Sequence, residues 1–502
     1  MSLLTLRAGA RRRLGRLVPA ILLLTLVVAC GGGREGTTGS PPPLGASPPA
    51  SVSVGAITGF GSVHLNGRQF ETTSAAITID GQSATQADLR VGEVIEVRGH
   101  HDDASNHDIA DAIEMRGNVE GPVSAIDPVA GTLGVLGQTV LVTADTSFDD
   151  DISPASLAGL AVGDIVEVSG LPAASGAIEA TRIEKKAAGA SFHVIGTASA
   201  TDSVAKTLKI NALTVDFTTA TLVDFPAAGP ADGDLIEATG STLTTTGTLT
   251  ATRLELRTGK GLKGDVDGAG EIEGLITRFA SATDFDVGGR PVSTSATTTF
   301  DGGSAADLAL DLKVEAEGTV DAAGVLVATR IRIEHAATQR ILAEVDAVDA
   351  TGGTVTLLGI QVSVGAMTRF EDHGPGHVST FSLADVHTGD WLEVRGSETP
   401  AGSHHLAATR LERRTQQPAV RLAGPVGSAA PPNLAILGVT VATTATTQFR
   451  DATGATVTAV AFFAAGPVGQ VVGVTGSWDG TTLTATEAAF GEADDDGGGG
   501  ED

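Results

Sequence analysis

Histidine and carboxylate side chains gather in two short stretches of this chain. The residues concerned are His100, His101, Asp102 and His107 in the first stretch, and His404 and His405 in the second. Imidazole nitrogens and carboxylate oxygens are common ligands of Zn²⁺, Cu²⁺ and Ni²⁺. Neither stretch has a defined ligand spacing, so a solvated polar loop is the alternative interpretation. Divalent-metal binding is therefore one hypothesis for these residues.

Other side chains that could bind a metal ion occur in less complete patterns. Glu371, Asp372, His373 and His377 add metal-ligand types to the second half of the chain. The acidic run 149–151 and the pair Asp265 and Asp267 invite a Ca²⁺ interpretation, but neither completes a loop that supplies six or more oxygens.

The sequence gives little evidence of a catalytic motif. The sequence lacks a Gly-x-Ser-x-Gly elbow, and its single cysteine is Cys30. Carboxylate pairs for glycoside hydrolysis stay open, because 60 Asp and Glu residues are available. The chain has no Tyr and two Trp. Trp391 is expected in the core, and Trp478 is the one expected exposed anchor. This composition disfavours a dedicated carbohydrate-binding protein.

The elements that must position these residues belong to a repeated cassette. Val-Gly-Asp-Ile-Val-Glu-Val-Ser-Gly at 162–170 leads to Ala-Ile-Glu-Ala-Thr-Arg-Ile-Glu at 177–184. β-Branched residues alternate with acidic ones, which predicts two half-buried strands of a hairpin, with Gly170 ending the first. The cassette glutamate is expected on the outward face of its strand. Related copies of the first segment occupy 91–99, 232–240, 312–318, 388–396 and 468–476.

A second repeated feature precedes most cassettes. It reads Thr-x-Phe followed by an acidic residue at 146–149, 298–301 and 368–371, and Thr-Gln-Phe-Arg at 447–450. The Phe is expected to enter the core, and the acid to begin a turn or cap a helix. Three alternating runs come before it and a short helix-like piece after it. This order of strands resembles the OB-fold, a small five-stranded Greek-key barrel.

The repeat period of roughly 70 to 80 residues is typical of a small domain. The sequence therefore predicts an all-β chain of six tandem OB-like barrels. The expected segments are a signal peptide (1–29), a flexible tether (30–53), barrels at 54–116, 117–188 and 191–258, a Gly-rich hinge (259–269), barrels at 270–336, 340–415 and 419–490, and an acidic, disordered tail (491–502).

The first thirty residues predict export and attachment to a membrane. Five arginines precede an apolar stretch, 17–29, of about the length of a signal-peptide core. Val-Val-Ala-Cys at 27–30 resembles a bacterial lipobox, which implies cleavage before Cys30 and lipidation of its thiol. An ordinary secretory signal with a chance cysteine is the alternative. Because Gly31 follows the cysteine, the same resemblance implies the outer membrane in a cell that has one.

The charge balance excludes one class of partner that OB-like barrels often bind. The formal net charge is −28 at pH 7. Nucleic-acid binding requires a basic groove for the phosphates, so no nucleic-acid partner is expected. The expected associations are with the membrane through Cys30 and with an envelope protein.

These motifs on a Gly- and Pro-tethered lipoprotein resemble a bacterial family of unknown function, the one numbered fifty-six sixty-six. The resemblance covers nearly all of the expected mature chain and supplies no catalytic residues. The residues that are expected to shape the fold recur from repeat to repeat, but no group of reactive side chains recurs with them. The sequence therefore predicts a non-enzymatic spacer, scaffold or protein-interaction array of the cell envelope, without a cofactor. The alternative is an envelope protein that binds a metal ion or small ligand through the His-rich hairpin loops of repeats 1 and 5.

Overall fold

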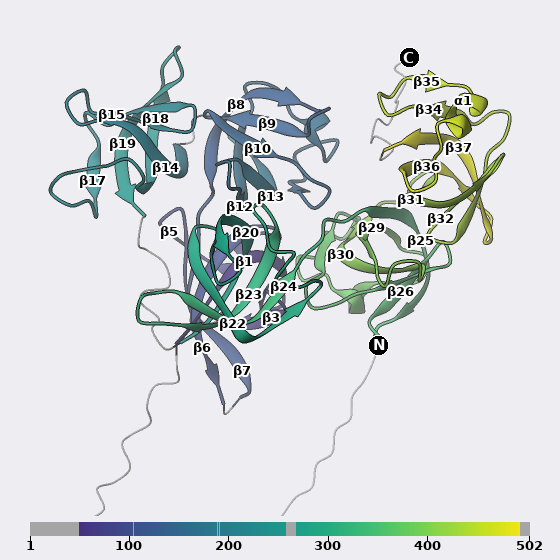
Figure 1. Ribbon diagram of the computed structural model, residues 1–502, viewed down its shortest axis with the longest axis horizontal. Coiled ribbons are helices and arrows are strands. Elements are labelled where there is room, and N and C mark those ends of the chain that lie inside the picture. The colour runs from purple at the N-terminus through teal and green to yellow at the C-terminus, as the bar shows by residue number, and fades with distance from the viewer. Residues whose placement is uncertain (1–49, 104, 188, 190, 258–267, 492–502) are drawn as a thin grey trace, which may run out of the picture. The chain divides into compact units, whose positions relative to one another are not determined.

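The computed structural model describes residues 50–103, 105–187, 189, 191–257 and 268–491 of the 502-residue chain (Figure 1). The predicted signal peptide, Cys30, all of the tether before residue 50, residues 259–267 of the expected hinge and the tail after residue 491 lie outside the described residues. The predictions for these segments therefore stay predictions.

Repeat 2 illustrates the fold that every repeat shares. Its strands are β8 (Val119–Asp127), β9 (Thr132–Val135), β10 (Gln138–Leu141), β12 (Ile165–Pro172) and β13 (Ile178–Lys186). They pair in the ring β8–β9–β10–β13–β12–β8, in which only β10 and β13 run parallel. A short strand, β11 (Ser147–Phe148), continues the parallel pairing along β13, and the 3₁₀ helix η2 (Leu157–Gly159) precedes β12.

The first and third repeats close in the same order. Repeat 1 consists of β1 (Ala50–Gly59), β2 (Val63–Leu65), β3 (Arg68–Glu71), β6 (Val94–Asp102) and β7 (His107–Met115), with β4 (Ala76–Ile79), β5 (Gln82–Ala84) and the 3₁₀ helix η1 (Gln86–Asp88) inserted. Repeat 3 consists of β14 (Phe192–Asp202), β15 (Thr207–Ile210), β16 (Leu213–Asp216), β18 (Leu235–Leu243) and β19 (Thr248–Leu256), with the short β17 (Thr221–Val223).

Repeats 4 to 6 repeat the pattern. Repeat 4 consists of β20 (Ala269–Ser281), β21 (Asp284–Val287), β22 (Arg290–Asp301), β23 (Lys313–Val320) and β24 (Leu326–Ile333). Repeat 5 consists of β25 (Gln339–Asp349), β26 (Thr354–Leu357), β27 (Ile360–Ser363), β28 (Arg369–Asp372), the 3₁₀ helix η4 (Leu383–Asp385), β29 (Trp391–Glu398) and β30 (His405–Arg414). Repeat 6 consists of β31 (Val420–Ala430), β32 (Asn433–Ile436), β33 (Val439–Ala442), β34 (Gln448–Arg450), β35 (Thr456–Val457), α1 (Ala459–Ala464), β36 (Val471–Trp478) and β37 (Thr482–Phe490).

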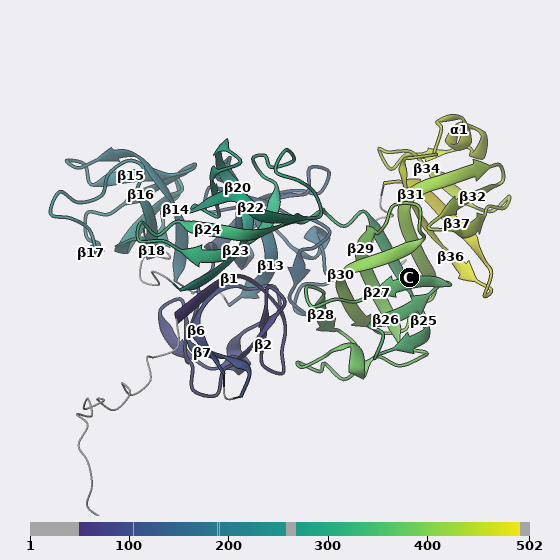
Figure 2. The same ribbon diagram turned by 60° about the horizontal axis from the view of Figure 1, so that its bottom comes forward.

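The prediction of an all-β chain of OB-like barrels is therefore confirmed. Strands β1, β2, β6 and β7 curve around one such barrel in Figure 2. None of the helices in the part of the chain that the structure describes has the length and apolar character needed to cross a membrane.

The barrels are joined in pairs by their first strands. β1 pairs in parallel with β20, β8 pairs antiparallel with β14, and β25 pairs antiparallel with β31. The strands therefore form three continuous sheets, which combine repeats 1 and 4, repeats 2 and 3, and repeats 5 and 6. Buried apolar residues of repeats 2 and 3 form one cluster, as do those of repeats 5 and 6. Pairing through the first strand leaves fewer unpaired edges on adjacent β-domains.

The glycine that closes each cassette has a different role from the predicted one. Gly170 lies inside β12 and does not end it. Ser169 pairs with Arg182 and Gly170 with Ala180, so Thr181 bulges out of the ladder. A Cβ on Gly170 would lie 2.3 Å from the carbonyl oxygen of Glu179, which is closer than van der Waals contact allows. Only glycine, which has no Cβ, fits at this position.

The same approach, at 2.0 to 2.2 Å, occurs at Gly99, Gly240, Gly318, Gly396 and Gly476. The bulge also reverses the alternation of inward- and outward-facing side chains along the rest of the second strand. The fully buried residue after it is Ile183 and not Arg182.

The repeated threonines are hydrogen-bond donors to the backbone around this bulge. The bulged threonine hydroxyl donates across the hairpin, as from Thr181 to the carbonyl of Ser169 at 3.0 Å. Thr252, Thr329, Thr409 and Thr486 repeat this bond in their own barrels at 3.0 to 3.3 Å. The threonine of the Thr-x-Phe motif donates to the alanine before the bulge, as from Thr146 to Ala180 at 2.7 Å. The two motifs thus hold the same corner of each barrel together.

The aromatic residue of the Thr-x-Phe motif enters the core, as predicted. Phe148 and Phe449 are buried, and Phe300 and Phe370 pack against their cores from partly buried positions. The acid begins a turn at Asp149, but Glu371 lies within β28. The helix-like piece that follows is a 3₁₀ turn in repeats 2 and 5 and a short α-helix, α1, in repeat 6.

Candidate functional site

The cassette glutamates face outward from their barrels, as predicted, yet they are not solvated. Glu167, Glu237, Glu315 and Glu393 are all at least nine-tenths buried. Each is paired with a basic side chain, for example Glu237 with Arg116 at 2.8 Å and Glu315 with Arg332 at 2.6 Å. The alternation of apolar and polar residues along a strand shows which side chains point away from the core. The neighbouring strands and repeats decide whether water reaches those side chains.

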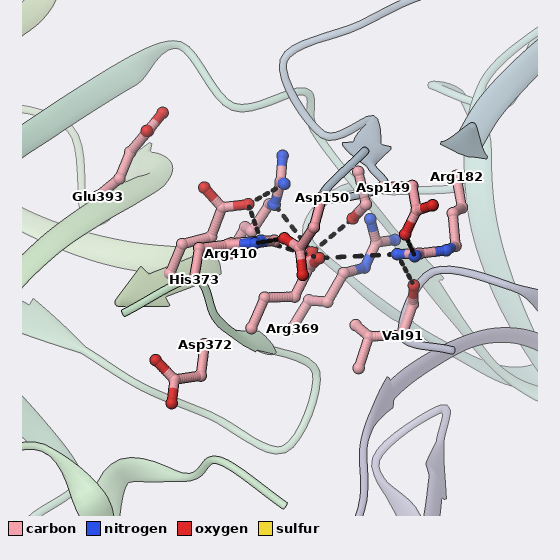
Figure 3. A network of polar contacts seen from close by, with 12 residues as sticks. Val91, Asp149, Asp150, Arg182, Arg369, Asp372, His373, Glu393 and Arg410 are labelled. Atoms are coloured by element: carbon pink, nitrogen blue, oxygen red, sulfur yellow. Dashed lines mark hydrogen bonds and ion pairs between the residues drawn. The ribbon is translucent and has the colours of Figure 1, made fainter. Parts of the chain in front are cut away.

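A dense group of buried charges, which we call the arginine cluster, joins repeats 2 and 5 (Figure 3). It consists of Arg182, Arg369, Glu371, His373, Arg410 and Glu412. Arg410 donates to Glu371 at 3.2 Å and also forms an ion pair with Glu412. Arg182 of repeat 2 approaches the other oxygen of Glu371 at 3.9 Å.

Backbone contacts complete this interface. Arg369 donates to the carbonyl oxygen of Asp145 at 2.6 Å, and Arg410 to that of Thr146 at 2.9 Å. Ser147 donates through its hydroxyl to Glu371 at 2.5 Å. Arg182 also reaches the carbonyl of Val91 in repeat 1 at 3.3 Å. The Thr-x-Phe and Ala-Thr-Arg segments of repeat 5 therefore contact the same two segments of repeat 2.

The electrostatics of the arginine cluster favour ionised carboxylates. Burial alone would raise the pKa of Glu371, but Arg410 and then His373 hold that pKa well below its ordinary value. Glu371, His373 and Glu412 are close enough together to be metal ligands. Three guanidinium groups already neutralise the two carboxylates, however, so a further cation gains little there.

A second group of metal-ligand types, which we call the junction site, has a different environment. It consists of Asp80 in the turn between β4 and β5, Glu167 in β12 and His193 in β14. One ligand atom from each of the three side chains lies within 4.8 Å of the others. Repeats 1, 2 and 3 each contribute one residue. Glu167 and His193 are buried, and the Asp80 side chain is about 31% exposed.

Strand register explains why these residues meet. Glu167 of β12 is directly opposite Glu120 of β8, which is in turn opposite His193 of β14. Directly opposite residues present their side chains on the same face of a sheet, and like charges so placed destabilise it. Lys186 compensates one oxygen of Glu167, at 2.5 Å. In the part of the chain that the structure describes, the other oxygen, Oε1, has no hydrogen-bond partner.

The protonation of Glu167 reflects this incomplete compensation. Burial raises the pKa of Glu167 to about 7, and nearby Asp80 contributes to the rise, whereas Lys186 acts in the opposite direction. Burial likewise raises the pKa of Glu120. Both carboxyl groups are therefore harder to ionise than ordinary glutamates.

The histidines predicted as ligands lie at exposed hairpin ends. His100 contacts Asp111 and His101 contacts Asp108, each at 3.0 Å, whereas His107 lies 3.9 Å from Glu71. Asp102 accepts a hydrogen bond from Ser105 at 2.7 Å. The structure thus gives these histidines separate carboxylate partners. In repeat 5, His404 lies 3.5 Å from Glu398, and the neighbouring His405 is exposed.

Other residues singled out in the sequence are placed as follows. Asp149 pairs with Arg182 at 3.2 Å, and Asp150 with His373 at 2.6 Å, so these acids of the run considered for Ca²⁺ face cationic or imidazole groups. Trp391 begins β29 and packs against the core from a partly buried position, as expected. The expectation that Trp478 is an exposed anchor is wrong, because its ring packs against the same core.

The comparison with known families fits this architecture. The family model "Domain of unknown function (DUF5666)" matches residues 53–114, 120–184, 196–255, 273–332, 343–412 and 423–488. The chain belongs to this family. Its six matches coincide with the six barrels, which confirms the resemblance stated from the sequence. No curated protein matches the chain. Nothing in the family description points to catalysis.

Sequence reasoning named Glu371 and His373 of the arginine cluster as metal-ligand types, but it missed the rest of that cluster and the assembly of the junction site. The arginine cluster joins residues of two repeats and the junction site residues of three, and Asp80 and His193 belong to neither repeated motif. For the junction site the signal in the sequence was the recurrence of the cassette glutamate, which correctly marked Glu167 as a residue that leaves the core.

Proposed function

We propose that this chain is a non-enzymatic, lipid-anchored protein of the cell envelope, and that its barrels form a scaffold that holds a partner protein at a distance from the membrane. The observation that carries the proposal is the use of the repeated residues. The closing glycine and both threonines stabilise the barrel corner, and the cassette Glu and Arg contact neighbouring strands or repeats. Among the described residues, the repeated glycines, threonines, glutamates and arginines named here thus serve contacts within and between barrels.

Pairing of repeats that are distant in sequence supports the scaffold role. The sheet that joins β1 to β20 brings repeat 4 against repeat 1, with repeats 2 and 3 between them in the chain. A chain built in this way resists extension, because separating two such barrels requires breaking backbone hydrogen bonds and exposing buried charge.

The expected attachment is through Cys30, with its thiol lipidated and followed by the predicted tether (30–53), of which residues 50–53 belong to β1 in the structure. This predicts that the protein is exported and, in a cell with two membranes, resides in the outer membrane. Metabolic labelling with an alkyne fatty acid tests it. Wild-type protein should take up the label and sediment with membranes, whereas Cys30→Ala should remain unlabelled. Equal labelling of both proteins would contradict the proposal.

The non-enzymatic role has its own test. Purified full chain should release no product from peptidoglycan or from generic ester and glycoside substrates, and cross-linking in intact cells should recover a discrete envelope protein. Turnover that is lost in Glu371→Gln or Glu167→Gln, with the fold intact, would overturn this role.

The predicted alternative, ligand binding by the His-rich hairpin loops of repeats 1 and 5, is less well supported. Their histidines face individual carboxylates at exposed positions. The scaffold role therefore remains our preferred proposal.

A further inference from the structure

We propose that the junction site binds one divalent transition-metal ion, with Asp80, Glu167 and His193 as its ligands. The site lies where repeats 1, 2 and 3 meet, so the ion would link three barrels. This inference does not depend on the proposed scaffold role.

The first argument is a polar atom without a partner. Glu167 is only 4% exposed, and its Oε1 has no hydrogen-bond partner among the described residues. A buried charged group in this condition costs free energy unless a cation or donor compensates it. Lys186 contacts only the other oxygen, Oε2.

The second argument is a small space that glycine leaves open. A Cβ on Gly117 would lie 2.6 Å from Oε1 of Glu167 and 3.0 Å from Nε2 of His193. Both atoms therefore line the same space above Gly117. Asp80 borders it too, because its Oδ1 accepts the Gly117 N–H at 3.2 Å and lies 3.9 Å from Nε2.

The third argument is the hydrogen-bonding environment of the histidine. A metal-bound imidazole nitrogen must be unprotonated, and the other nitrogen usually donates to a carboxylate that fixes the ring. Nδ1 of His193 lies 3.7 Å from Glu120, which is placed to accept that proton. Nε2 then faces the site. In the structure Nε2 lies 3.0 Å from the carbonyl oxygen of Gly117, which can only accept, so Nε2 carries the proton and donates it there. An ion at the site would replace this hydrogen bond, and the proton would move to Nδ1, on the side of Glu120.

The charge and geometry also fit. Asp80, Glu120 and Glu167 place three carboxyl groups near the ammonium of Lys186, which Glu184 also contacts at 2.8 Å. A divalent ion would therefore meet an excess of carboxyl groups and would favour their ionised form. Ligands at 2.0–2.2 Å from a tetrahedral ion are roughly 3.4 Å apart. Ligand atoms within 4.8 Å of one another reach that spacing with small side-chain movements. The partly exposed Asp80 side chain gives an ion access from solvent.

The ligand types narrow the class of metal. Imidazole favours Zn²⁺ and neighbouring first-row ions, whereas carboxylates also suit Mn²⁺. Zn²⁺ is therefore the appropriate probe, with Mn²⁺ as a comparison.

The test is calorimetric titration of Zn²⁺ into the purified full chain, in a Cys30→Ala background that removes the only thiol. One equivalent should bind, and Glu167→Gln and His193→Asn should each weaken binding at least tenfold. The Gln side chain mimics the protonated carboxyl, so this variant should keep its fold. Asp80→Asn is a second variant, because asparagine tolerates the left-handed backbone at this turn (φ 48°).

The matched control is the double variant His100→Ala and His101→Ala, which changes the exposed hairpin only. It should bind Zn²⁺ as the parent does. Loss of binding in this control alone, or a titration that is unchanged in Glu167→Gln, His193→Asn and Asp80→Asn, would overturn the assignment. Co²⁺ absorption of the parent chain gives an independent readout. Visible bands that Asp80→Asn leaves unaltered would also count against the junction site.

Discussion

Two equivalent rows of residues, one in each of two paired sheets, carry the same cassette glutamate in opposite electrostatic states. In repeats 2 and 3 the row across β12, β8 and β14 is Glu167, Glu120 and His193. In repeats 5 and 6 the row across β29, β25 and β31 is Glu393, Leu342 and Arg421. Both glutamates are about 95% buried.

The neighbours explain the difference. Burial alone would raise the pKa of Glu393, but Arg340 and then Arg414 and Arg395 hold it well below its ordinary value. Arg340 and Arg414 lie 2.8 and 3.1 Å from the carboxylate. Glu167 has only Lys186 at 2.5 Å, and burial, with Asp80 adding to it, raises its pKa to about 7. The same motif position is thus a closed ion pair in one sheet and an incompletely neutralised carboxylate in the other.

The largest expected effect concerns the closed row. Arg340→Met leaves Glu393 buried with fewer cations, so the free energy of unfolding should fall by about 3 to 5 kcal/mol. Urea unfolding followed by tryptophan fluorescence measures this, because Trp391 and Trp478 both lie in the sheet of repeats 5 and 6. Arg450→Met, which breaks a more exposed ion pair with Glu487 in the same sheet, is the control and should cost less than about 1 kcal/mol. Equal costs would show that the buried row is no more tightly coupled than the surface.

The two glutamates should also respond oppositely to pH. The raised pKa of Glu167 makes its contribution to stability present below pH about 4.5 and lost as pH rises through about 7. The free energy of unfolding of Glu167→Gln, measured relative to wild type, should therefore rise by on the order of 2 to 3 kcal/mol between pH 5 and pH 8. Hydrogen exchange of β12 and β14, with a chelator present, measures the local change.

The matched variant is Glu393→Gln. The contribution of Glu393 is present above pH about 4.5 and lost as pH falls below it, because its folded pKa is lowered. This variant should be less stable than wild type at neutral pH and should approach wild type in acid. The same pH response in both variants would remove the electrostatic contrast between the rows.

The next effect tests the space above Gly117 without changing a ligand. Gly117→Ala places a methyl group against Oε1 of Glu167 and Nε2 of His193. Zn²⁺ affinity should fall by about 10- to 100-fold, which equals about 1.4 to 2.8 kcal/mol. Calorimetric titration measures it. Gly365→Ala, where the added Cβ meets nothing within 4 Å, is the control and should leave affinity unchanged. Undiminished affinity in Gly117→Ala would place the ion elsewhere.

The smallest effect concerns the ammonium that competes with an ion. Lys186→Met removes the positive charge 2.5 Å from Glu167 Oε2. Zn²⁺ should then bind several-fold more tightly, because repulsion between the two cations is relieved and a carboxylate oxygen is freed. Weaker binding in this variant would mean that Lys186 organises the site and does not compete for it.

Much of the local structure followed from the sequence. Alternation of β-branched and polar residues located the strands of each barrel, and the spacing of the Ala-Thr-Arg segments gave the number of repeats. The role of Gly170 was misjudged, because a glycine that ends a strand and one that permits a close crossing have the same identity. Only the paired strand, with its bulge at Thr181, distinguishes the two cases.

The sequence by itself determined the barrel, its repetition and the direction in which residues of the first cassette strand point, because these depend on a period of two along a single strand. Only the tertiary structure decided that repeat 1 pairs with repeat 4, that Glu167 and Glu393 are withdrawn from water, and that the first lies beside His193 while the second lies among arginines. The physical reason is that burial and charge compensation depend on what covers the outer face of a barrel, and here the cover comes from residues far away in the chain.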